Sequence, residues 1–130
     1  MTVYLSVGQI EDLHEKQVAA FGGSAGLRDR GGLEAAAVRP QMTFGGEDLY
    51  LDLPTKAAAL LHSLVMNHPF LDGNKRAGAM ASEYFLRANG VVLVASDQEL
   101  IDLILAVARG EVSAEALAIW FRQRTQEREG

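Results

Sequence analysis

Nine consecutive residues near the middle of the chain carry side chains that could act on a phosphate group. They read His68-Pro69-Phe70-Leu71-Asp72-Gly73-Asn74-Lys75-Arg76. A neutral imidazole is the usual base for removing a proton from a hydroxyl group, which makes His68 the candidate base. A carboxylate would repel a phosphate unless it holds Mg²⁺ beside it, which makes Asp72 the candidate metal ligand.

The end of the same segment indicates a phosphate-binding site. Gly73 and Asn74 lie where a loop is expected to turn into a helix, so backbone N–H groups without intrahelical partners point outward there. Glycine also lets a phosphate approach the backbone closely. Lys75 and Arg76 put positive charge at the positive end of the helix dipole, a conflict that a bound polyphosphate would remove. Base, metal ligand and phosphate site together predict transfer of a phosphorus group to a hydroxyl.

Each of these residues has a plainer explanation when it is taken alone. A histidine after a helix is commonly a cap or a packing residue, Asp-Gly is commonly a turn, and lysine and arginine are commonly solvated surface charges. Their occurrence together within nine residues is what favours the catalytic interpretation.

Two predicted helices must position this segment. Asp52-Leu53-Pro54 opens the first, since proline is favoured in the first turn, and the helix should end near Asn67, just before Pro69. Its broad apolar face suggests a central, buried helix. The second is predicted over Asn74 to Asn89 and is closed by glycine.

The remaining segments also favour helices, apart from two short stretches. Gln41 to Leu53 reads as a loop or short hairpin, and Val91 to Val94 as a strand-like connector. The other helices are predicted from a capping box at Ser6 to Gly22-Gly23, over Leu33 to Val38 with Pro40 ending it, from Ser96 to Gly110, and from a cap at Ser113 onward. The sequence therefore predicts an all-α protein, a compact single-domain helical bundle spanning residues 1–130.

The composition narrows the function classes. With 130 residues, 48% of them hydrophobic, the chain can bury one core. The absence of cysteine excludes disulfides, thiolate metal sites and thiol nucleophiles. A net charge of −5 argues against direct nucleic-acid binding. Because no signal peptide and no membrane-spanning stretch is evident, we expect a cytoplasmic protein without membrane association.

The segment resembles the signature of the Fic/Doc family, in which His-Pro-Phe is followed by an acidic residue and then Gly-Asn-Gly-Arg. Here the third of these last four residues is Lys75, as in the Doc (death-on-curing) toxins of toxin–antitoxin pairs. The resemblance covers nearly the whole chain. It includes Gly26-Leu27-Arg28-Asp29, Arg39-Pro40-Gln41 and Phe85-Leu86-Arg87-Ala88-Asn89-Gly90.

The resemblance implies a helical bundle of the Fic/Doc type with a flap that aligns a target polypeptide, and Met42 to Leu51 occupy the flap's place. His68 would activate the target hydroxyl, and Asp72 would hold Mg²⁺. The phosphates of ATP would be bound by Gly73, Asn74, Lys75 and Arg76. The candidate catalytic residues are His68, Asp72, Asn74, Lys75 and Arg76. Phe70 would anchor the loop in the core.

The resemblance also implies a reaction and partners. With Lys75 in place of glycine, the γ-phosphate of ATP would be presented, giving a protein serine/threonine kinase. In the Doc group the target is elongation factor Tu, whose phosphorylation inhibits translation, and the toxin is controlled by a Phd-like antitoxin. One alternative is a Fic-type adenylyltransferase, which Ala79 weakens because the Fic pattern has a second arginine there. The other is a catalytically silent binding module of the same fold.

Three further features are weighed and set aside. His14 and His62 lie on predicted helices among apolar neighbours, so we expect packing or hydrogen bonding rather than catalysis. Thr125, Glu129 and Gly130 match the loose pattern of a self-inhibitory segment in some Fic proteins. We expect no such role, because the C-terminal end should fray and Doc-like proteins are controlled by a partner.

Overall fold

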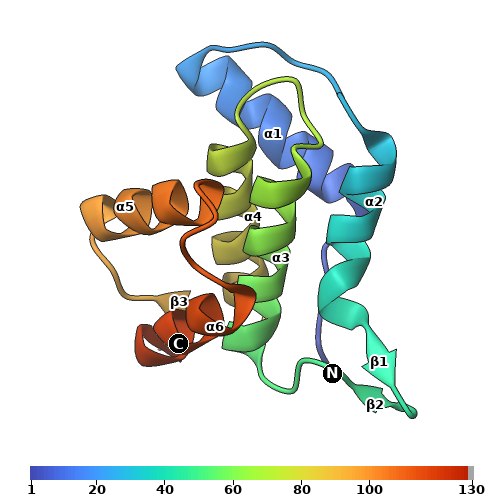
Figure 1. Ribbon diagram of the computed structural model, residues 1–130, viewed down its shortest axis with the longest axis vertical. Coiled ribbons are helices and arrows are strands. Elements are labelled where there is room, and N and C mark those ends of the chain that lie inside the picture. Colours follow the sequence, from blue (N-terminus) through green and yellow to red (C-terminus); the bar gives the residue numbers. More distant parts are fainter. Residues whose placement is uncertain (129–130) are drawn as a thin grey trace.

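The computed structural model describes residues 1–128, over which the chain forms six α-helices and two small antiparallel strand pairs (Figure 1). The helices are α1 (Val7–Phe21), α2 (Arg30–Val38), α3 (Leu53–Asn67), α4 (Asn74–Ala88), α5 (Asp97–Ala108) and α6 (Ala114–Gln123). A 3₁₀ turn, η1 (Arg39–Gln41), follows α2. The strand pairs join β1 (Thr43–Phe44) to β2 (Glu47–Asp48) and β3 (Val91–Leu93) to β4 (Thr125–Glu127). The predicted helical fold class is confirmed.

Helix α3 runs through the middle of the molecule, and α2, α4, α5 and α6 all pack against it (Figure 1). Alanine and leucine dominate its sequence, so neighbouring helices can approach from several sides. Nine of its residues are buried, which confirms the predicted central helix: Lys56, Ala57, Ala58, Ala59, Leu60, Leu61, Ser63, Leu64 and Val65.

The helices begin where capping residues satisfy their first amides. Asp52 accepts a hydrogen bond from the Thr55 amide at 2.7 Å, and Ser6 and Ser96 form the predicted capping boxes. Helix α2 begins earlier than predicted, because Asp29 caps it through the Gly32 amide at 3.0 Å. Gly31 and Gly32, which precede the predicted start of this helix at Leu33, are therefore helical.

The predicted end of α2 is confirmed: the α-helix stops at Val38, and Pro40 follows in the first turn of η1, where no proline N–H is required. One sequence prediction was wrong at an element end. The C-terminal end does not fray over residues 125–128, since β4 pairs with β3 and the Arg128 amide donates to the Gly90 carbonyl at 2.8 Å. Val91–Leu93, predicted as a strand-like connector, is the partner strand.

The predicted hairpin is confirmed and lies at the N-terminal end of α3. Gly45 and Gly46 form its turn with φ of 61° and 84°, values that glycine adopts at little cost. The hairpin and the segment 68–76 lie at opposite ends of α3 (Figure 1), which spans 15 residues and thus about 22 Å. In the part of the chain that the structure describes, no helix combines the length and apolar character needed to cross a membrane.

Candidate active site

The connection from α3 to α4, residues 67–73, turns sharply at the candidate base. His68 caps α3 in the left-handed conformation, with φ 47° and ψ 55°. This conformation is uncommon for a residue with a side chain and costs about 1 kcal/mol, so the surrounding contacts must hold it. The imidazole is exposed, and its Nδ1 lies 3.4 Å from Asn74 Nδ2. A contact this long holds the ring only weakly.

Asn74 closes this connection from the side of α4. Its Oδ1 accepts from the Phe70 amide at 2.9 Å, and its Nδ2 donates to the Phe70 carbonyl at 3.0 Å. Asn74 is buried, at 7% exposure. Its side chain therefore shapes the loop, while its backbone amide remains at the helix start.

His14 of α1 supports the loop from below. Its ring stacks on Phe70 with centroids 3.8 Å apart and the two planes 4° from parallel. Its Nε2 donates to the Asp72 carbonyl at 2.7 Å, which places a proton on that nitrogen. The expectation that His14 serves packing and hydrogen bonding is confirmed.

Residues 26–29, which we call the strap, bind the loop from the other side. The amides of Arg28 and Asp29 donate to the Pro69 carbonyl at 2.8 and 3.0 Å, and the Leu71 amide donates to Gly26 at 3.1 Å. The Arg28 guanidinium donates to the carbonyls of His68 and Asn67 at 2.7 and 2.8 Å. The strap therefore satisfies carbonyl groups that α3 leaves unpaired at its end.

Arg28 and Asp29 have different roles in the strap. Asp29 is the N-cap of α2. Arg28 forms no ion pair within residues 1–128 and binds backbone carbonyls instead. The sequence hints at this role of Arg28 only in that the last carbonyls of a helix need donors.

A cavity of about 300 Å³ opens at the start of α4. The first hydrogen bond within the helix runs from the Ala77 amide to the Gly73 carbonyl. The amides of residues 74–76 lie before this bond and have no carbonyl of the helix to donate to. The side chains of Lys75 and Arg76 are exposed, and the Arg76 guanidinium lies 4.8 Å from the Phe21 ring centroid. Unpaired amides and two cations at one helix start are the features that an anion-binding site requires. The cavity is lined by Gln17, Gly22, Asp72, Gly73, Asn74, Lys75 and Arg76.

Asp72 stands at the edge of this cavity and suits a magnesium ion that phosphates help to bind. Its Oδ1 accepts from the Gly73 amide at 2.8 Å, and a Cβ on Gly23 would come within 2.7 Å of its Oδ2. Gly23 thus leaves room beside that oxygen. Residues 1–128 contain no cluster of three or more histidine or acidic side chains that could hold a metal ion. A single carboxylate fits Mg²⁺, which commonly takes one or two carboxylates and completes its shell with phosphate oxygens and water.

Gln17 of α1 is a site residue that the sequence reading missed. It is 2% exposed, lines the cavity, and its Oε1 has no hydrogen-bond partner within the described structure. A side chain at Gly73 would collide with its amide. Gln17 therefore explains why this position is glycine, in addition to the positive φ of 78°.

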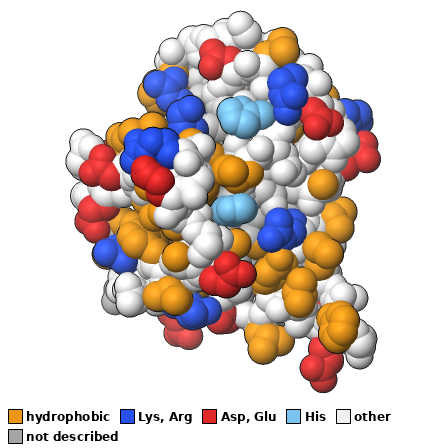
Figure 2. Space-filling model, viewed as in Figure 1, with side chains coloured by type: hydrophobic (Ala, Val, Ile, Leu, Met, Phe, Trp, Pro, Cys, Tyr) orange, Lys and Arg blue, Asp and Glu red, His pale blue; other side chains and the backbone are white. Residues whose placement is uncertain are grey.

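His62 and His68 are the histidines that reach the surface, because His14 is buried. Figure 2 shows two histidines on one face of the molecule, with basic side chains on either side of the upper one. Burial and the nearby Arg39 guanidinium lower the pKa of His62, although Glu115 acts in the opposite direction. His62 therefore stays neutral at lower pH than an exposed histidine would.

Comparison with known proteins shows the family to which the chain belongs. Residues 4–86 match the Fic/DOC family. The chain is 50% identical over 95 residues to Toxin Doc of Mycolicibacterium smegmatis, and these residues are 73% of this chain and 71% of that protein. It is 33% identical over 120 residues to Protein kinase doc of Escherichia phage P1, and these residues are 92% of this chain and 94% of that protein. The predicted family is confirmed: this chain belongs to the Fic/Doc family.

Proposed function

We propose that the protein is the toxin of a toxin–antitoxin pair and that it transfers the γ-phosphate of ATP to a serine or threonine hydroxyl of a translation factor. Elongation factor Tu is the proposed target, and blocked translation the proposed outcome. Similarity to proteins named Toxin Doc and Protein kinase doc supports this proposal. A target in the translation machinery also implies a cytoplasmic protein.

One observation carries the proposal: an exposed imidazole stands beside an anion site at the mouth of one helix. His68 lies in the turn that leads directly into α4, and Asn74 both contacts its ring and closes the loop. Lys75 and Arg76 extend from the first turn of the same helix. His68 does not line the cavity at the start of α4, but Asn74 does, and its side chain links the His68 ring to the proposed phosphate site.

The proposed step is an exchange of one bond for another at phosphorus. His68 accepts the proton of the target hydroxyl as its oxygen bonds to the γ-phosphorus, and the bond from that phosphorus to the β–γ bridging oxygen breaks, releasing ADP. The amides and cations of Gly73 to Arg76 hold the phosphates. Asp72 would hold Mg²⁺, which would offset phosphate charge.

Adenylyl transfer is the alternative reaction. It would require the α-phosphorus at His68. Lys75 puts a long cation where adenylyltransferases of the family have glycine, and Ala79 stands where their pattern has a second arginine. Ala79 is half-buried beside Lys75 and Arg76 in a separate apolar groove, so it supplies no charge for a second phosphate contact.

The proposal includes an inhibitory partner. A protein with this reactivity needs control, and the relative's name Toxin Doc supports a cognate antitoxin, which we propose to be Phd-like. The self-inhibition pattern lies partly outside the described residues, because Glu129 and Gly130 are beyond residue 128. Its remaining member, Thr125, pairs with Leu93 in the β3–β4 sheet.

Labelled ATP tests the proposal. The purified protein is incubated with elongation factor Tu and ATP that carries its label at either the α- or the γ-phosphate. We expect the γ label on the factor, at a serine or threonine, and none with His68→Ala. Transfer of the α label would instead show adenylylation, and transfer of neither label to any polypeptide would favour the silent binding module.

A further inference from the structure

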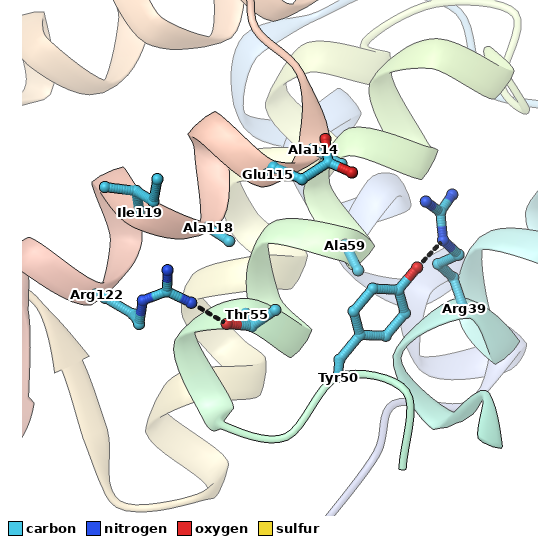
Figure 3. Close-up of a pocket in the computed structure, with 9 residues that line it drawn as sticks. All are labelled: Arg39, Tyr50, Thr55, Ala59, Ala114, Glu115, Ala118, Ile119 and Arg122. Carbon is cyan, nitrogen blue, oxygen red and sulfur yellow. Dashed lines mark hydrogen bonds between the residues drawn. The ribbon is translucent and has the colours of Figure 1, made fainter. Parts of the chain in front are cut away.

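A second pocket, of about 250 Å³, lies between α3, α6 and the end of the hairpin segment (Figure 3). It is separate from the cavity at the start of α4, and the proposed reaction does not use it. Its lining residues come from distant parts of the chain: Arg39, Tyr50, Thr55, Ala59, Ala114, Glu115, Ala118, Ile119 and Arg122.

Arg39 is held in this pocket by neutral groups. Its Nε donates to the Tyr50 hydroxyl at 2.6 Å, and its Nη1 donates to Ser63 Oγ at 3.1 Å. No carboxylate of residues 1–128 forms an ion pair with it. Its charge is therefore uncompensated by direct contact, and its remaining N–H groups can donate to a ligand. A fixed, half-buried guanidinium of this kind favours a carboxylate or phosphate partner.

The other charges of the pocket favour a single negative charge. Arg122 donates to Thr55 Oγ1 at 2.9 Å and lies 3.8 Å from the Asp52 carboxylate. Glu115 also lines the pocket (Figure 3). Because Asp52 already pairs with Arg122, Arg39 is the lining cation without a carboxylate partner among residues 1–128. One carboxylate ligand would match that single charge, whereas a phosphate dianion would bring two negative charges beside Glu115.

The pocket lies on the α3 face that leads toward His68. Thr55 and Ala59 line it and occur one turn apart on that face, which continues through Ser63, the partner of Arg39. Thr55 and Ala59 lie about 20 and 14 Å from His68 along the helix axis. An extended polypeptide, which advances about 3.3 Å per residue, would cover this distance with about four to six residues.

We infer that this pocket binds an acidic side chain of the polypeptide substrate, four to six residues from the hydroxyl that receives the phosphate. Arg39 is the main contact, and Arg122 supports it. Glu115 selects a carboxylate over a phosphate. The inference rests on the proposed function, since it takes His68 as the site of the target hydroxyl. It gives the protein a specificity determinant that lies away from the reacting atoms.

A peptide series tests the inference. Each peptide has one threonine and one glutamate, placed two to eight residues away on either side, and a matched peptide has glutamine instead. Fluorescence anisotropy measures binding to the full-length protein, and γ-labelled ATP measures transfer. We expect glutamate four to six residues from threonine to bind about five- to tenfold tighter than glutamine, with no advantage at two residues.

Three variants bear on the pocket directly. Arg39→Gln and Arg122→Gln should each reduce the glutamate advantage, Arg39→Gln the more. Glu115→Gln should increase it about threefold, a gain that misfolding cannot produce. Arg109→Gln, an exposed arginine outside the pocket, is the matched control and should change nothing.

The outcomes separate this inference from the proposed function. Equal binding of the glutamate and glutamine peptides at all positions, or an equal loss with Arg109→Gln, would overturn the inference. A preserved glutamate advantage in binding without any phosphate transfer would overturn the kinase proposal and leave the acidic-residue pocket standing.

Discussion

Helix α3 ends in two connections that are built in different ways. At its C-terminal end, the loop 67–73 is bonded from both sides, by the strap and by Asn74. At its N-terminal end, every residue from Gln41 to Leu49 is exposed, and the hairpin is fixed mainly at its base. There Lys56, which is buried, donates to Asp48 Oδ2 at 3.1 Å and to the Tyr50 carbonyl.

The difference matches what each end would have to do. A base and a phosphate site must be held to within a fraction of an ångström, which the doubly bonded loop provides. The hairpin instead exposes unpaired strand edges and apolar side chains, with Phe44 at 82% and Leu51 at 78% exposure. Such a surface suits contact with a polypeptide partner. Under the proposed function, one end of α3 would carry the chemistry and the other would contact a partner.

The largest effect is expected from removing the proposed base, His68, at the C-terminal end of α3. His68→Ala should lower the rate of phosphate transfer about 100- to 10,000-fold and abolish growth arrest, while the free energy of unfolding changes little because the side chain is exposed. His68→Asn, which tolerates the left-handed backbone, should lose activity equally. Unchanged growth arrest in both variants would favour a silent binding module.

A matched pair of glycine substitutions compares the two ends directly. Gly73 and Gly46 both have positive φ, but a Cβ at Gly73 would meet Gln17, whereas a Cβ at Gly46 would meet open space. Gly73→Ala should cost about 2–4 kcal/mol and Gly46→Ala about 1 kcal/mol, measured by urea unfolding. Adding Gln17→Ala should recover part of the Gly73→Ala loss. Equal costs at the two positions would show that the ends do not differ in packing.

Lys56→Met tests what fixes the hairpin base. Burial lowers the pKa of Lys56, but hydrogen bonds with Tyr4 and Asp48 outweigh it and raise the pKa above its ordinary value. The charged form is therefore favoured in the folded protein. Met fills a similar volume but leaves the Tyr50 carbonyl without its donor, so we expect a loss of about 1–3 kcal/mol in urea unfolding. Phosphate transfer to a short peptide should stay near the wild-type rate.

Arg28→Lys tests the strap. A lysine cannot donate to the carbonyls of Asn67 and His68 with the fixed geometry of a guanidinium. We expect kcat for transfer to fall about tenfold with a stability loss of about 1 kcal/mol. Arg30→Lys, at an exposed position whose ion pairs are with Glu11 and Glu34, is the control. Similar kcat for both variants would mean that the strap does not position the base.

The smallest expected effect concerns the pH dependence of stability. The pKa of His62 is lowered in the folded state, so the unfolded chain binds a proton more readily. The free energy of unfolding should therefore fall as the pH drops below about 6.5, by less than about 1 kcal/mol. His62→Gln should remove this part of the loss between pH 7.5 and 5.5. An identical pH dependence in the variant would contradict the assignment.

Signals local in sequence predicted most of the fold. The caps Asp52 and Ser96 begin helices where expected, and the segment 68–76 could be interpreted because its chemistry is contiguous. Gly31-Gly32 misled the prediction of α2, because glycines favour turns unless a cap such as Asp29 begins the helix ahead of them. Residues 125–127 were missed because their partner strand lies more than thirty residues away.

The supporting shell of the site could not be predicted for the same reason. Arg28 and Gln17 contact the loop from positions 39 or more residues away in the chain. A single sequence carries no signal for such contacts beyond the unmet need for donors at the end of α3. The pocket around Arg39 likewise exists only because η1, α3 and α6 meet in space.

The strap belongs to the connection between α1 and α2, and its hydrogen bonds hold the turn at His68. A ligand-responsive domain inserted between Gly45 and Gly46 would leave that turn undisturbed. The same insertion within residues 26–29 would divide the strap. The strap could then hold the turn only while the inserted domain keeps its own two ends close together. If the protein is the proposed toxin, growth of a host cell could then be switched by the ligand of the inserted domain, with no change to residues 68–76.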